Sequence, residues 1–198
     1  MNISFIAVIV IVVLLILYII GIFNTFVVLK NRYLNAFAQI EVQLKRRYDL
    51  IPNLVETAKA YLKHERETLE LVVKARNQAV QTLENAKTNQ AEPQHIEALG
   101  KAEQNLQSAL GRLNVVVEAY PELKANENMI KLHEEIATTE NRVAFARQAF
   151  NDSVMSYNTY RQSFPQNVFA TSFGHAKDAV LLEFQDSAAM QNAPKISF

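Results

Sequence analysis

Residues 3–29 form an apolar run without a charged side chain, and no other feature of the sequence constrains the fold as strongly. A helix needs about 20 apolar residues to cross the hydrocarbon core of a bilayer. A lone spanning segment must satisfy its own backbone hydrogen bonds, so it has to be helical. A cleaved signal peptide would instead have a shorter apolar core, a preceding basic residue and a small-residue cleavage site. We therefore predict that residues 1–29 are a transmembrane anchor in the lipid bilayer.

The charges that flank this run predict its orientation. No charged side chain precedes it, whereas five basic residues follow soon after it, with only Glu41 and Asp49 to offset them. These basic residues are Lys30, Arg32, Lys45, Arg46 and Arg47. Lys and Arg near the ends of a span favour the cytoplasmic side. The pattern predicts an N-terminus outside the cell and a C-terminal domain in the cytoplasm.

The rest of the chain is predicted to be one all-α domain. Apolar residues after position 30 recur at helical spacing, without the sustained alternation that is typical of strands. The chain has only four glycines and five prolines, so its elements should be long. Short links between long amphipathic helices favour antiparallel neighbours. We predict an elongated antiparallel helical bundle over residues 30–190, which the anchor enters as a continuous helix, and a short C-terminal tail over residues 191–198.

The first three helical segments are separated mainly by prolines. The anchor is expected to continue until Pro52 bends or ends it, because a proline inside a helix removes one backbone hydrogen bond. A second segment, over about residues 53–87, shows a three–four alternation of apolar residues that is typical of bundle packing. Pro93 then fits the first turn of a third helix, where its missing N–H has no intrahelical partner to lose.

Pro121 opens a fourth segment, over about residues 122–160, in the same way. Its apolar residues repeat every seven positions, at Met129, Ile136, Val143, Phe150 and Tyr157. A short apolar link follows over residues 164–173. Gly174 then precedes a last, shorter predicted helix with one apolar face, which carries Ala176, Val180, Phe184 and Ala188.

Charged residues interrupt the apolar seams of these predicted helices. They are Glu65, Arg76, Glu103, Glu140 and Arg147. A lone buried charge costs several kcal/mol, so we expect these glutamates and arginines to pair between helices. The favoured interpretation is that such pairs set the register and the partner of each helix, as polar seam residues do in coiled coils. A metal or ligand role for the carboxylates is the alternative.

Motifs for catalysis are missing from the sequence. A di-iron bundle needs a Glu-x-x-His motif on two helices, and the chain offers one copy, Glu92 with His95, beside a proline. The sequence contains no His-Glu-x-x-His zinc motif and no glycine-rich phosphate loop. It also has no cysteine, which excludes thiolate metal sites and a cysteine nucleophile. We expect a protein that is not an enzyme and that has no cofactor and no metal.

With these residues in view, the chain resembles the LemA family of bacterial membrane proteins. The resemblance is carried by Arg46, Arg47, Asp49, Pro52 and Asn53 in the stretch QLKRRYDLIPNLV, by Asn151, Tyr157 and Asn158 in the block 140–158, and by Pro165. Phe150 stands where the family usually has tyrosine. The resemblance implies a single-pass protein of the bacterial inner membrane, with a short outer N-terminus, a cytoplasmic helical domain and no established enzymatic activity. It also implies an association with a membrane zinc protease or with stress responses.

Three functions are consistent with this sequence. The first is a membrane-anchored, non-enzymatic scaffold or adaptor that self-associates or binds a partner at the cytoplasmic face. A homo-oligomer is expected here, because the β-branched span can pack against copies of itself. The second is a regulatory partner of a membrane zinc protease in the envelope stress response, and the third is a metal or small-ligand binder that uses the seam carboxylates. The net charge of zero supplies no basic field for nucleic acid, so no nucleic-acid partner is expected.

Overall fold

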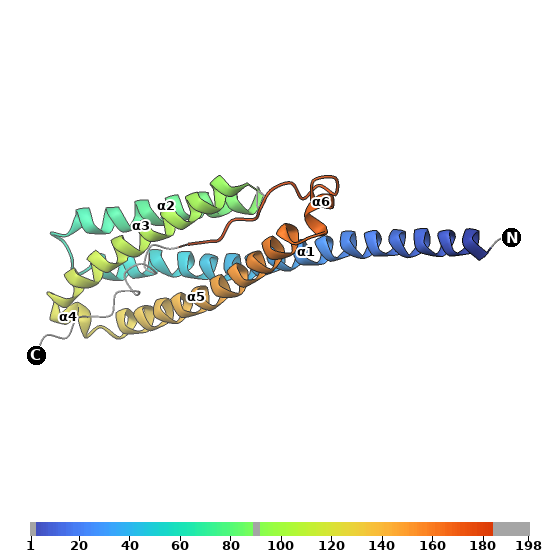
Figure 1. Cartoon of the computed structure of the whole chain (residues 1–198). Helices are drawn as coiled ribbons and strands as arrows, with labels where there is room; N and C mark the ends of the chain where they lie inside the picture. Colours follow the sequence, from blue (N-terminus) through green and yellow to red (C-terminus); the bar gives the residue numbers. More distant parts are fainter. Residues whose placement is uncertain (1–2, 89–91, 184–198) are drawn as a thin grey trace, which may run out of the picture.

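The computed structural model describes residues 3–88 and 92–183, and these residues form six α-helices and no strand (Figure 1). The helices are α1 (Ile3–Lys59), α2 (Arg66–Thr88), α3 (Pro93–Glu118), α4 (Pro121–Lys124), α5 (Glu127–Gln162) and α6 (Gln166–Ala170). The prediction of an all-α, elongated helical bundle is confirmed.

Helix α1 is the axis of the molecule. It is 57 residues long, which corresponds to about 86 Å at 1.5 Å per residue. Helix α5 lies antiparallel along its C-terminal half, and the hairpin of α2 and α3 packs on another side (Figure 1). The short helix α6 lies where α1 leaves the bundle, and the N-terminal half of α1 projects beyond it.

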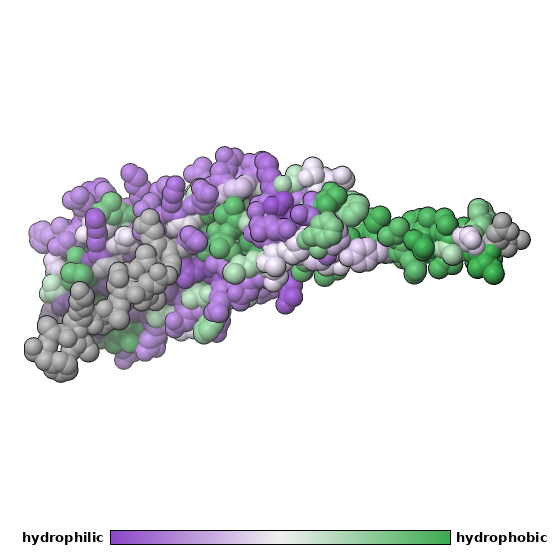
Figure 2. Space-filling view, in the orientation of Figure 1, coloured by the Kyte–Doolittle hydropathy of each residue, from purple (hydrophilic) through white to green (hydrophobic). Residues whose placement is uncertain are grey.

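The projecting part of α1 is long and apolar enough to cross a membrane. Leu14 and Leu17 in this part are more than half exposed, and Figure 2 shows it as a continuous hydrophobic rod beyond a largely hydrophilic bundle. Packing against the bundle starts within the apolar run, because Ile22 and Phe26 are already buried. The apolar run therefore has two parts: the first projects from the bundle, and the last belongs to the protein core.

The expectation that Pro52 could end the first helix is wrong, since α1 continues through it to Lys59. A proline at this position cannot donate to the carbonyl four residues earlier, which belongs to Tyr48. In the structure, Nε of Arg76 on α2 donates to that carbonyl oxygen over 3.1 Å. A side chain from the neighbouring helix thus replaces the missing helical bond, and α1 remains unbroken.

Other predicted boundaries are also corrected. The segment 53–87 is not one helix, because α1 ends at Lys59 and a turn precedes α2; buried Leu62 keeps the apolar pattern intact across that turn. The helix at Pro121 is short, and α5 begins only after Asn126, whose side chain accepts a hydrogen bond from the backbone N–H of Met129. That local bond competes with helix continuation and favours an N-cap.

The prediction of a last helix after Gly174 is also wrong for the part of it that the structure describes. The chain from Ala176 to Val180 and on to residue 183 is extended rather than helical (Figure 1). The remaining two residues of its expected apolar face, Phe184 and Ala188, lie outside the described residues, as does the predicted tail 191–198.

The Arg76 bond predicts a specific coupling with Pro52. Replacing Arg76 by Met leaves the Tyr48 carbonyl without a donor and should destabilise the bundle by about 1–3 kcal/mol. In a Pro52→Ala background the alanine N–H can bond that carbonyl, so Arg76→Met should cost distinctly less. Urea unfolding of the four proteins of this double-mutant cycle, in detergent, measures the coupling. An equal cost of Arg76→Met in both backgrounds would contradict the explanation.

Candidate functional site

A buried polar cluster joins α1 to α3 in the middle of the bundle. Arg47 is 4% exposed and Glu103 is 2% exposed. The Arg47 guanidinium donates to one carboxylate oxygen of Glu103, and the hydroxyl of Tyr48 donates to the other. Burial raises the pKa of Tyr48, so its hydroxyl remains a donor. Both oxygens of the carboxylate are thus satisfied, as a buried charge requires.

Among the other charged residues of the predicted seams, Glu65 and Arg76 lie outside this cluster. Glu65 lies in the turn before α2, and Arg76 bonds a backbone carbonyl rather than a glutamate. Glu140 is exposed, so its predicted place inside the bundle is wrong, although its charge still acts on Arg47. Arg147 is half-buried on α5. Over residues 3–88 and 92–183, no group of three His, Asp or Glu side chains is arranged to hold a metal.

An extended segment over residues 175–183, which we call the strap, is held by two asparagines of α5. Asn158 bonds both backbone groups of Ala179, at 2.8 and 2.9 Å. Asn151 does the same for Leu182, at 3.2 and 2.9 Å. Seven helical residues rise about 10 Å, and three extended residues span about 10 Å. The spacings match, so the two amides clamp successive points of the strap.

A glycine on α3 allows the strap to pass close to that helix. A Cβ on Gly100 would lie 2.6 Å from the carbonyl oxygen of Glu183, so a larger residue would collide with the strap. The strap therefore lies between α5 and α3 and closes the bundle there. Sequence reasoning missed it; the available signals were the seven-residue spacing of Asn151 and Asn158 and a glycine in the middle of a helix.

An aromatic cluster surrounds His175 where α1 leaves the bundle. The ring of Phe26 stacks on the imidazole at 4.6 Å, and the hydroxyl of Tyr157 lies 3.0 Å from Nδ1. Burial and the charge of Lys30 lower the pKa of His175, so the ring is neutral near pH 7. Burial raises the pKa of Tyr157 to about 12, which keeps its hydroxyl protonated. The cluster is closely packed and gives this end of the bundle a fixed shape.

A groove of about 1000 Å³ lies between the last turns of α1 and helix α2. Its floor is apolar and its rim is charged. The lining includes Ile51, Pro52, Val55, Leu62, Leu69 and Val73, with Glu56, Lys59, Lys63, Arg66, Glu70, Lys74 and Arg76 around them. The five basic groups outnumber the two acidic groups, so the rim is net positive. The groove suits an apolar ligand surface that is flanked by acidic groups.

The residues of the family motif fall into two sets. Arg47, Tyr157, Asn151 and Asn158 make the internal contacts described above, whereas Pro165 follows a cis peptide bond between α5 and α6. The others are exposed on α1, and they are Arg46, Asp49, Pro52 and Asn53.

Comparison with known proteins gives one family and a small set of relatives. The model of the LemA family matches residues 36–198. Two magnetosome proteins MamQ of Paramagnetospirillum magneticum are each 25% identical to the chain over 172 residues, which covers 78% of the chain and 63% of the relative. A protein LemA of Metamycoplasma hominis is 25% identical over 141 residues, with 71% and 60% covered. The chain thus spans about three-fifths of the length of these relatives.

The buried cluster predicts a large stability loss when Glu103 becomes Gln. In this variant an amide N–H2 group faces one of the two donors, and Arg47 loses its buried carboxylate partner, so the loss should be about 3–5 kcal/mol. Glu97→Gln, at an exposed position of the same helix, should change stability by less than about 0.5 kcal/mol. Urea midpoints of the detergent-solubilised proteins test this. Similar midpoints for the two variants would refute the role of the cluster.

The strap predicts separable effects on amide exchange. Asn158→Leu removes the acceptor of the Ala179 N–H, so exchange of that amide should accelerate roughly two- to tenfold. The Leu182 amide, held by Asn151, should change less. Asn141→Leu, at an exposed position of α5, is the matched control and should affect neither. Residue-resolved hydrogen exchange is the measurement, and unchanged Ala179 exchange in Asn158→Leu would contradict the clamp.

Proposed function

The chain belongs to the LemA family, and from this premise we propose that it is a membrane-anchored, non-enzymatic adaptor that holds a partner at a fixed height above the bilayer. The bundle lies in the cytoplasm, with the N-terminus outside, at the inner membrane of a bacterium. Support for this orientation comes from the basic residues Lys30 and Arg32 directly after the apolar run.

The continuity of α1 is the observation that carries this proposal. The helix passes from its exposed apolar half into the bundle without a break, and Arg76 supports it across Pro52. A flexible linker would let the bundle move freely, whereas one helix fixes its distance from the membrane. Val55, in the groove, lies 26 residues beyond Leu29, which corresponds to about 40 Å along the axis.

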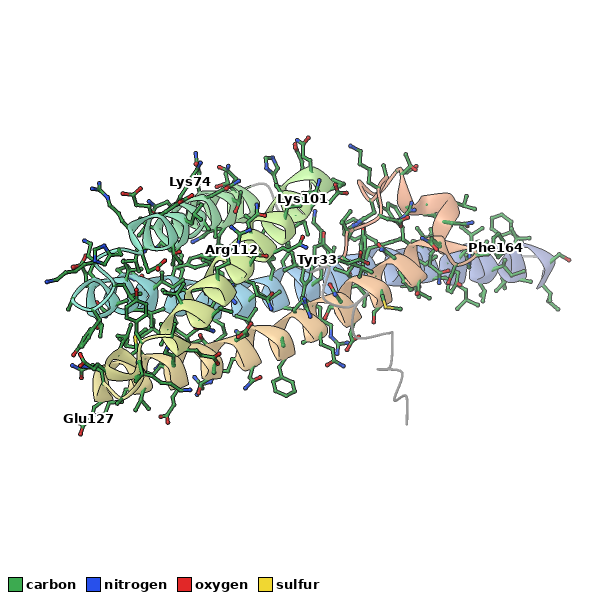
Figure 3. All side chains as sticks on the ribbon, turned by 90° about the vertical axis from the view of Figure 1, so that its left-hand side faces the viewer. Tyr33, Lys74, Lys101, Arg112, Glu127 and Phe164 are labelled. Atoms are coloured by element: carbon green, nitrogen blue, oxygen red, sulfur yellow. The ribbon has the colours of Figure 1, made fainter. Side chains whose placement is uncertain are left out.

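The groove at this distal end suggests the chemistry of the partner. Its apolar floor fits one face of an amphipathic helix, which is a common mode of recognition. Lys63 and Lys74 stand on the rim and form no ion pair within residues 3–88 and 92–183, and Lys74 projects outward from α2 (Figure 3). Complementary charge favours association and orients the partner. We assign the groove to an amphipathic segment with acidic flanks.

The names of the relatives do not restrict this chain to one partner. Two of the relatives are named as magnetosome proteins and one as a protein LemA, and none of these names states a reaction. A membrane zinc protease and a second copy of the chain are specific versions of the partner, and the experiment below distinguishes them. The seam-carboxylate metal site gains no support from the described residues, because they hold no suitable cluster.

Site-specific photo-cross-linking tests the proposal in intact cells that produce the full chain. A photoreactive residue at Val73, which is 40% exposed in the groove, should give adducts with a peptide that is amphipathic and acidic. The same residue at Val115, 70% exposed on α3, is the control position. Lys63→Glu with Lys74→Glu should reduce the Val73 adduct at least about fivefold by reversing the rim charge, whereas Lys101→Glu on α3 should not.

The identity of the adduct decides between outcomes. An acidic segment of a zinc protease would support the adaptor and name its partner. The same adducts at Val73 and Val115, or a Val73 adduct whose yield does not fall in the charge-reversal variant, would overturn the proposal that the groove binds the partner. Adducts with a second copy of this chain alone would replace the partner by self-association.

A further inference from the structure

The segment from the last residue of α5 to the start of the strap is free of charge. Residues 162–176 contain no Asp, Glu, Lys or Arg over 15 positions, in a chain that is 20% charged. Arg161 and Lys177 border it on either side. We call this segment, which includes α6, the connector. Outside the apolar run, no other stretch of the described residues is uncharged over such a length.

One face of the connector packs on α1. The ring of Phe173 meets Phe23 edge-to-face at 5.3 Å and stacks on Phe169 at 5.8 Å. Ala170 in α6 is buried as well. The connector is therefore fixed at the height of Phe23, which still belongs to the apolar run, and not at the height of the charged bundle.

Two other apolar side chains of the connector are exposed. Phe164 is 82% exposed and Val168, four residues later, is 64% exposed. Figure 3 shows Phe164 at the end of the bundle from which α1 projects. Figure 2 shows hydrophobic and neutral side chains at this junction rather than the hydrophilic ones that dominate the bundle.

The length of the projecting part of α1 places the connector at the edge of a bilayer that this helix spans. Ile3 to Phe23 is 21 residues, or about 31 Å, which equals the hydrocarbon core of roughly 30 Å. The next seven residues, up to Lys30, rise about 10 Å through the headgroup layer. Val28 is 62% exposed within that layer. A bilayer that covers α1 to Phe23 must also reach the connector, which lies at the same height.

We propose that the connector is a second membrane-contact surface, which inserts Phe164 and Val168 into the headgroup region beside the spanning helix. Aromatic and small polar residues without charge suit this layer, where an apolar ring and hydrated amides coexist. A single span leaves tilt and rotation to be set by its flanking anchors. The connector is displaced from the axis of α1, so its contact fixes the direction in which the bundle stands.

Fluorescent depth measurement tests this proposal directly, because the chain has no cysteine and accepts single labels. The variants Phe164→Cys and Val168→Cys carry an environment-sensitive dye in the full-length protein, reconstituted into phosphatidylcholine–phosphatidylglycerol vesicles. Phe145→Cys, 73% exposed on α5, is the matched water-exposed control. Leu14→Cys, 60% exposed in the apolar half of α1, is the deep control.

Nitroxide lipids with shallow or deep quenchers report the depth of each dye. We expect shallow quenching at 164 and 168 that is at least threefold stronger than at 145, and deep quenching at 14. Water-like emission at 164 with normal quenching at 14 would overturn the connector contact and leave the span intact. A blue-shifted dye at 164 that lipid nitroxides do not quench, and that responds to the protein-to-lipid ratio, would overturn it in favour of a second copy.

Discussion

The bundle depends on the way in which one residue of α1 holds two other helices. The side chain of Tyr48 donates to Glu103 on α3, and its carbonyl accepts from Arg76 on α2. The neighbouring Arg47 completes the contact with Glu103. Both helices of the α2–α3 hairpin are thereby joined to α1 at one height by polar bonds. Because Pro52 creates the free carbonyl that Arg76 fills, the proline takes part in this joint and does not interrupt the helix.

Polar bonds of this kind define the register between helices, which apolar seams alone do not. Seven-residue apolar repeats let a helix slide along its neighbour by one repeat with little change in buried area. A buried charge cannot slide without leaving its partner, which costs several kcal/mol. The Arg47–Glu103 pair therefore defines the register of α3 on α1, and the amides of Asn151 and Asn158 define that of the strap on α5. Burial of apolar surface supplies the stability, and the polar contacts select one arrangement.

Local periodicity predicted the helices of this chain well, and distant contacts account for the errors. Met129, Ile136, Val143, Phe150 and Tyr157 are all buried, as their seven-residue spacing indicates. The turn before α2 was missed because Leu62 continues the apolar pattern through it. The strap was missed because its hydrogen bonds come from asparagines more than 20 residues away. The partner of Glu103 was not identified either, since Arg47 lies 56 residues earlier on another helix.

Uncharged and charged features are arranged in sequence along α1, from the apolar run to the far end of the bundle. Nearest the membrane, the connector meets Phe23 with uncharged side chains, and the His175 cluster packs at Phe26. The charged pair at Arg47 is buried farther out, and the groove opens beyond it. A charge near the hydrocarbon core is costly, whereas the distal end is free to carry a basic rim. A rigid axis with an uncharged connector near the apolar run and a basic groove rim at the far end is the arrangement that the proposed anchoring and partner binding would require of a single helix.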